Sequence, residues 1–173
     1  MLRTSKLRRR LVRNQDGSAA VEFALVALPF CFMIFAILEL GLVFVLDSVL
    51  ENATIETGRL VRTGQAQASS MDAAGFKSAL CDRMSIFAGP CSTQVQVDVR
   101  EMPDFATVAP DPMQAGSFNS ALLTYGNGSA GSLMLVRVWY RHPLMTTFLS
   151  QGLSRMDDGT AMLTATTAFR NEP

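Results

Sequence analysis

A long apolar segment near the N-terminus constrains this chain more than any other feature. Between Phe23 and Leu46 the only charged residue is Glu39. This stretch exceeds the roughly 20 apolar residues that a helix needs to cross the hydrocarbon core of a bilayer. A helix of a soluble protein carries one apolar stripe, whereas this segment is apolar on every face. The sequence therefore predicts a membrane-spanning helix.

Basic residues concentrate ahead of the apolar segment. Most residues with charge before Gly17 are Lys or Arg, and Asp16 is the one acidic residue there. Because short flanks rich in Lys and Arg stay in the cytoplasm, residues 1–17 are expected to form a cytoplasmic leader. The chain beyond the apolar segment is then exported. Since juxtamembrane arginines account for this charge, a nucleic-acid-binding role is not expected.

The helix is expected to continue past the membrane. After residue 46 apolar and small residues recur at spacings of three and four, which is typical of one buried stripe on a helix. These residues are Val49, Leu50, Ala53, Thr57, Leu60 and Val61. The sequence thus predicts one helix over residues 18–63, transmembrane to about 46 and amphipathic thereafter, followed by a small polar linker at 64–70.

Residues 71–173 are expected to form an exported α+β domain. Ser69 followed by Asp72 fits a capping pattern for a short helix from Met71 to about Phe87, ended by Gly89-Pro90. Its inward face is predicted to carry Phe76, Leu80 and Met84. Three strands are expected: a half-buried one with Val95, Val97 and Val99 inward, then Leu133 to Tyr140, then Ala161 to Phe169. The predicted class is a long N-terminal transmembrane and amphipathic helix followed by a short helix and a three- to four-stranded antiparallel sheet.

The cysteines fit this topology. Cys31 lies in the apolar segment and is interpreted as a small buried apolar residue. Cys81 and Cys91 are both in the exported part, where an oxidising compartment lets disulfides persist. Neither belongs to a C-x-x-C pair and the chain has one histidine, so a zinc site is not expected. A Cys81–Cys91 disulfide is predicted.

Three kinds of targeting segment compete for the N-terminus. A secretory signal peptide has an apolar region of about 7–15 residues, which this segment far exceeds. A plain signal anchor explains everything except the spacing of Gly17 and Glu22. A prepilin-type signal explains that as well, since cleavage between Gly17 and Ser18 would make Glu22 the fifth residue of the mature chain.

The prepilin reading has a physical rationale. Cleavage creates a positive amino group on Ser18, and Glu22 lies one helical turn away. The carboxylate can neutralise that amine, or the amine of a neighbouring subunit, at the edge of a low-dielectric region. Glu22 is therefore predicted to be an assembly contact.

Several segments together resemble the TadE-like pseudopilins of the Tad/Flp pilus system. They are DGSAAVEFALVALPF, Glu39-Leu40-Gly41, ENATIETGRLVRTGQA, the Cys81–Cys91 spacing, the Val95-Gln96-Val97 strand and the ending FRNEP. A TadG-like protein would have a longer exported region, and a major Flp pilin would be shorter and lack the β domain. The choice between a TadE-like and a TadF-like protein stays open.

The resemblance implies a small single-pass protein of the bacterial inner membrane that is processed by a prepilin peptidase. Its implied partners are that peptidase, other pilins or pseudopilins, the pilus assembly platform and membrane lipid. It implies no cofactor, no metal, no small-molecule substrate and no enzymatic activity. The alternative is an uncleaved single-pass envelope protein whose exported domain binds a protein partner.

Two further residues have competing interpretations. Glu39 is either an intramembrane contact to an assembly partner or a residue near the outer interface that snorkels or is protonated. His142, with Asp157 and Asp158, invites an anchored hydrolase, but no nucleophile motif accompanies it. An exposed histidine in a turn at a strand end is the simpler expectation.

Overall fold

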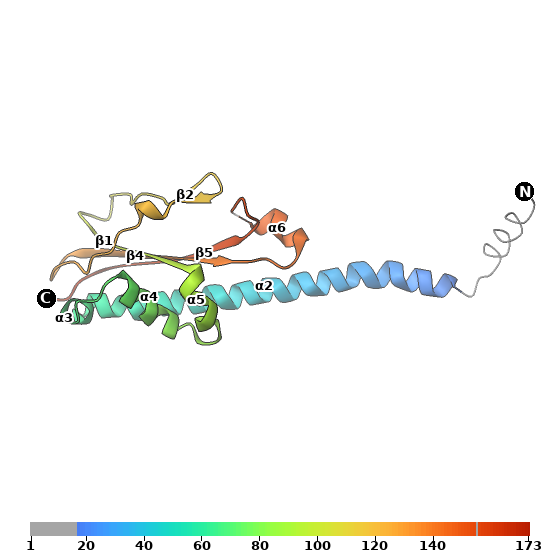
Figure 1. Ribbon diagram of the computed structural model, residues 1–173, viewed down its shortest axis with the longest axis horizontal. Coiled ribbons are helices and arrows are strands. Elements are labelled where there is room, and N and C mark those ends of the chain that lie inside the picture. Colours follow the sequence, from blue (N-terminus) through green and yellow to red (C-terminus); the bar gives the residue numbers. More distant parts are fainter. Residues whose placement is uncertain (1–16, 155) are drawn as a thin grey trace, which may run out of the picture. The chain divides into compact units, whose positions relative to one another are not determined.

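The computed structural model describes residues 17–154 and 156–173, including their side chains except those of Thr147 and Phe148. The predicted leader, apart from Gly17, lies outside the described residues. The chain divides into two compact units, Met1–Leu38 and Glu39–Pro173. Helix α2 (Ser18–Arg62) contributes its first part to one unit and the rest to the other (Figure 1). Its bounds match the predicted helix to within a residue.

The second unit is built on a three-stranded antiparallel sheet in the order β1-β4-β5. The strands are β1 (Val95–Met102), β4 (Leu133–His142) and β5 (Ala161–Arg170). Val136 in the central strand is opposite Val99 on one side and Thr167 on the other. The connection from β1 to β4 contains a small hairpin of β2 (Met113–Gln114) and β3 (Ser117–Phe118). The predicted α+β class is confirmed.

Short helices occupy the remaining connections. They are α3 (Gln65–Ala68), α4 (Ala73–Asp82), the 3-10 turn η1 (Ser85–Phe87), α5 (Ala88–Gln94), the 3-10 turn η2 (Ser120–Leu122) and α6 (Thr147–Leu153). The segment predicted as a linker thus contains one helical turn, α3. It follows Gly64, whose φ of 76° is a left-handed conformation that glycine adopts without steric cost.

The predicted helix from Met71 to Phe87 is wrong in its start and its end. Asp72, not Ser69, caps α4, because its carboxylate accepts the Gly75 N–H at 2.8 Å. The Ser69 hydroxyl instead bonds to the carbonyl of Gln65 in α3 at 2.8 Å. Gly89 and Pro90 lie in the first turn of α5 rather than ending a helix. Proline is tolerated there because first-turn amides have no partner within the helix.

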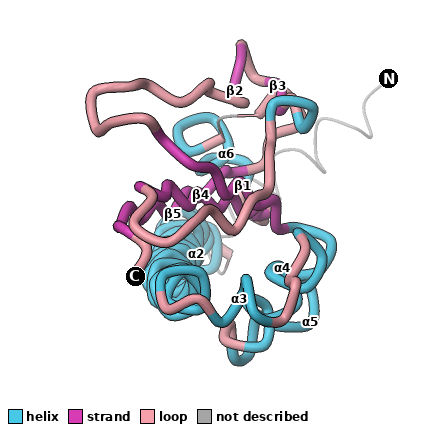
Figure 2. The backbone as a smooth tube through the Cα atoms, turned by 90° about the vertical axis from the view of Figure 1, so that its left-hand side faces the viewer, coloured by secondary structure: helices cyan, strands magenta, loops and turns pink. Residues whose placement is uncertain are grey.

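One face of the sheet packs against α2 and α4 (Figure 2). The second part of α2 lies close to β5 at Gly58, where an added Cβ would lie 3.2 Å from Phe169 and 3.3 Å from Thr167. The predicted inward residues Phe76, Leu80 and Met84 are all fully buried. On α2 the buried stripe after Glu39 consists of Leu46, Leu50, Ala53, Thr54, Thr57, Gly58 and Val61. A helical stripe and a sheet face therefore form the main core.

The other face of the sheet is also covered: Val95, Val97 and Val99 are buried as predicted, but Asp98 on the opposite side of β1 is buried as well. The connection containing β2 and β3 lies over this face (Figure 2). Trp139, Met156 and Met162 are buried beneath it, and the Phe118 ring meets the Trp139 ring edge-on at 5.6 Å between centroids. Alternation along β1 predicted a solvated face, but a long connection packs there instead.

Asp98 is the charged residue that this cover buries. Its carboxylate has no exposed surface and pairs with Arg100 at 2.6 Å and with Arg137 at 2.7 Å. It also accepts the backbone N–H of Thr124 at 2.9 Å. Arg100 and Arg137 donate onward to the carbonyls of Leu122 and Pro110, both at 2.8 Å. One buried carboxylate therefore ties two strands to the long connection on both sides of its small hairpin.

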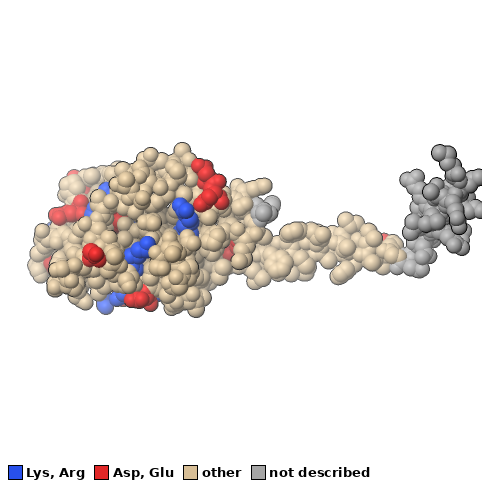
Figure 3. Space-filling view, viewed as in Figure 1, with Lys and Arg blue, Asp and Glu red and all other residues tan. Residues whose placement is uncertain are grey.

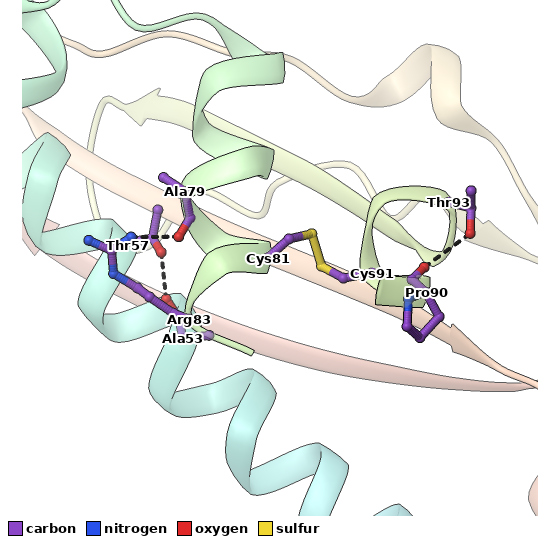
Figure 4. The surroundings of a disulfide bond; sticks show 8 residues. All are labelled: Ala53, Thr57, Ala79, Cys81, Arg83, Pro90, Cys91 and Thr93. Atoms are coloured by element: carbon purple, nitrogen blue, oxygen red, sulfur yellow. Dashed lines mark hydrogen bonds between the residues drawn. A yellow bond between two sulfur atoms is a disulfide. The ribbon is translucent and has the colours of Figure 1, made fainter. Parts of the chain in front are cut away.

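A disulfide joins α4 to α5, as predicted. Cys81 and Cys91 are bonded, with Cα atoms 5.5 Å apart, and both are buried (Figure 4). The bridge closes a short loop and so restricts the unfolded chain, an effect of about 2–3 kcal/mol in loop-entropy estimates. Cys31 is a free cysteine.

The Asp98 cluster predicts a loss of stability in acid. Burial raises the pKa of Asp98, but hydrogen bonds from Arg100, Thr124 and Arg137 outweigh it and hold the pKa below its ordinary value. A carboxyl with a lowered folded-state pKa stabilises fully above its unfolded pKa of about 3.9, and that stability disappears as pH falls through the folded pKa. Denaturant titrations of the wild type should therefore show unfolding free energy decreasing below about pH 4.

The Asp98→Asn variant should lose about 3 kcal/mol at neutral pH, at the low end for a broken buried ion pair because the two arginines stay 12% and 15% exposed. Its acid dependence should be weaker than that of the wild type. Glu101→Gln, an exposed carboxylate on the same strand, is the matched control and should change neither quantity. An unchanged acid dependence in Asp98→Asn would contradict this assignment.

Candidate functional site

The start of α2 carries the predicted processing residues. Gly17 precedes the helix, and its carbonyl accepts the Val21 N–H at 3.1 Å, which is the first helical hydrogen bond. Gly17 and Ser18 are both exposed. The peptide bond between them therefore lies at the helix start, where the first amides have no intrahelical partner.

Ser18 and Glu22 are in contact. The Ser18 hydroxyl donates to Glu22 Oε1 at 2.9 Å, across one turn of the exposed helix. The amide nitrogen of Ser18 belongs to the first turn of α2, where amides have no acceptor within the helix. An amino group created on that nitrogen would be on the same residue whose side chain already reaches the carboxylate. The structure thus brings together two of the predicted residues.

The part of α2 that follows is apolar and exposed around its circumference. No large side chain from Phe23 to Leu38 is buried among the described residues. Residues 23–38 include no Asp, Glu, Lys or Arg, and the narrow helical part of the molecule in Figure 3 is tan along most of its length. By length and composition α2 can cross a membrane. Cys31 lies on this surface, so a bilayer or neighbouring helices would have to bury it.

Glu39 is buried within the second unit. It is 9% exposed, and its carboxylate accepts the backbone N–H of Met145 and, at 2.9 Å, that of Thr146. These amides precede and begin α6. The sequence left Glu39 either as an intramembrane contact to an assembly partner or as a residue near the outer interface, and these backbone partners were not predicted. The one sequence feature that points to this contact is the segment from Pro143 to Ser154, between the second and third predicted strands. It contains no Asp, Glu, Lys or Arg.

His142 differs from the exposed turn residue that was expected. It is the last residue of β4, paired with Ala161, and half-buried. Burial lowers its pKa, and the charge of Glu39 raises it by a smaller amount. Asp158 lies instead in an ion pair with Arg141 at 3.5 Å, and the Asp157 N–H donates to the Gly116 carbonyl at 3.0 Å. The two aspartates are engaged in holding the connections over the sheet.

Comparison with known families gives one finding that bears on this region. The model of the family described as TadE-like protein matches residues 17–59. The match begins at Gly17 and includes Ser18, Glu22 and Glu39, so it confirms the resemblance for α2. It does not extend to the disulfide or the sheet. No curated protein and no solved structure matches the chain.

Proposed function

We propose that this TadE-like chain is a minor pseudopilin that acts in the assembly or priming of a Tad/Flp-type pilus. The observation that carries the proposal is the family match from Gly17 onward, on a helix whose fifth residue after that glycine is Glu22. In this account the prepilin peptidase cleaves after Gly17. The chain lies in the bacterial inner membrane with its N-terminus in the cytoplasm and its domain outside.

The exposed apolar surface of α2 supports this role. A helix with apolar residues on every side is stable in lipid, and it is equally suited to packing among similar helices. A pseudopilin needs both environments, first as a membrane protein and then beside other pilins or pseudopilins at the assembly platform. The partners proposed are thus the peptidase, related pilin subunits, the platform and lipid.

Glu22 supports the assembly part of the proposal. When the new Ser18 amine packs among neighbouring helices, its positive charge loses its hydration, which is costly unless an opposite charge pairs with it. The contact between the Ser18 side chain and Glu22 places a carboxylate within one turn of that amine. The exported domain is proposed to be a binding module, with no enzymatic activity, cofactor or nucleic-acid partner.

Processing is the first test. Mass spectrometry of the protein from membrane fractions of piliated cells should find Ser18 as the N-terminal residue. Gly17→Arg should abolish cleavage, because the peptidase has to accommodate a small residue before the scissile bond. Gly17→Ala is the control that keeps a small residue and should still be cleaved. A wild-type chain that still begins at Met1 would overturn the pseudopilin proposal in favour of an uncleaved envelope protein.

Assembly is tested separately through Glu22. Glu22→Ala should leave insertion and most cleavage intact but reduce piliation strongly, because the Ser18 amine then lacks its partner. Glu22→Gln keeps the size without the charge and should behave like Glu22→Ala. The matched control is Glu51→Ala, an exposed carboxylate on the same helix, which should be piliated like the wild type. Piliation is scored by microscopy and processing by gel mobility in the same cells; normal pili with Glu22→Ala as the only copy would exclude an assembly role for this carboxylate.

A further inference from the structure

The connection between β4 and β5 lies along the part of α2 where the apolar run ends. At its start, Met145 and Thr146 donate their backbone N–H groups to Glu39. At its other end, Leu153 lines a cavity of about 290 Å³ together with Val43 and Asp47 of α2. The connection therefore follows α2 from residue 39 to residue 47, which is ~12 Å at the usual helical rise.

This region is uncharged, and much of its apolar surface is exposed. From Pro143 to Ser154 the chain contains no Asp, Glu, Lys or Arg. The Met145 side chain is 93% exposed and that of Leu153 is 37% exposed. Exposed apolar side chains of α2 lie at the same level. We refer to this set as the apolar collar: Leu42, Phe44, Val45, Met145 and Leu153.

The position of the collar along α2 indicates which part of the bilayer it contacts. If Glu22 lies at the inner edge of the hydrocarbon, as the proposed function requires, Glu39 lies ~25 Å further along the helix. The hydrocarbon core is ~30 Å thick. Glu39 and the two backbone N–H groups that donate to it then lie just inside the outer edge of the hydrocarbon core. The collar extends from there into the headgroup region.

We propose that the apolar collar is a membrane-interface element that inserts into the outer leaflet around α2. Met145 enters deepest, because its backbone is held at Glu39, and Leu153 lies nearer the headgroups. An ionised carboxylate in hydrocarbon is costly unless it is paired. The amides of Met145 and Thr146 supply Glu39 with the donors that water would otherwise provide, and Glu39 satisfies amides that would otherwise face lipid.

The collar fits a lipid surface better than it fits water. Single exposed apolar residues are ordinary on a protein surface, but large ones gathered at one level mark an interaction site. Here they are continuous with a helix segment that is itself suited to lipid. The domain would thus rest on the membrane surface through a second contact besides its anchor, and this contact limits how the domain can tilt before assembly.

The depth of Met145 tests the inference, which rests on the proposed membrane placement of α2. The full chain is reconstituted into vesicles of phosphatidylcholine and phosphatidylglycerol, with a nitroxide on Met145→Cys in a Cys31→Ser background. Collision with oxygen reports lipid, and collision with a water-soluble nickel chelate reports solvent. The references are a label on native Cys31 for the bilayer and Ile86→Cys, 82% exposed on η1, for water.

The Met145 label should collide with nickel several-fold less than the Ile86 label and should retain high oxygen access. Adding Glu39→Ala should move it toward the Ile86 values. Equal nickel access at Met145 and Ile86, with Cys31 shielded, would overturn the collar alone. Nickel access at Cys31 would overturn the membrane placement and with it the proposed function. Low access to both reagents at Met145 would mean that protein covers this residue, which also contradicts insertion into lipid.

Discussion

One helical backbone has to satisfy two different environments, and the rest of the structure depends on how it does so. From Phe23 to Leu38 the large side chains of α2 are apolar and exposed all around the helix. From Glu39 onward the buried residues form one stripe, which is covered by the molecule's own sheet. The backbone is helical throughout, so the difference between the two parts lies in the pattern of their side chains.

The second unit is organised around the part of that helix that it contains. At Gly58 the absence of a side chain lets α2 lie close to Thr167 and Phe169. At the end of α2 the Arg62 carbonyl accepts the Glu172 N–H at 2.8 Å, and the two side chains form an ion pair. The C-terminal residues are therefore fixed to the helix at which the domain begins.

The sequence predicted the features that depend on local pattern. The helix, the three long strands, the disulfide and the inward face of α4 follow from periodicity, composition and compartment. The failures involve contacts between distant segments. The alternation along β1 indicated that Asp98 was solvated. This failed because no local pattern shows that the connection after β1 folds over that residue. Glu39 is 106 residues from Met145, so its partners were not visible in the sequence either.

The reactivity of single cysteines along α2 tests most directly whether the helix changes environment. Each position is alkylated with a membrane-impermeant maleimide in vesicles carrying the full chain, in a Cys31→Ser background. We expect protection at every position from Phe23 to Leu38, whichever way it faces. Beyond Asp47 reactivity should repeat about every 3.6 residues, high at Glu51 and low at Leu50. The same helical repeat within residues 23–38 would show that this segment packs against protein on one side and water on the other, and would contradict the account.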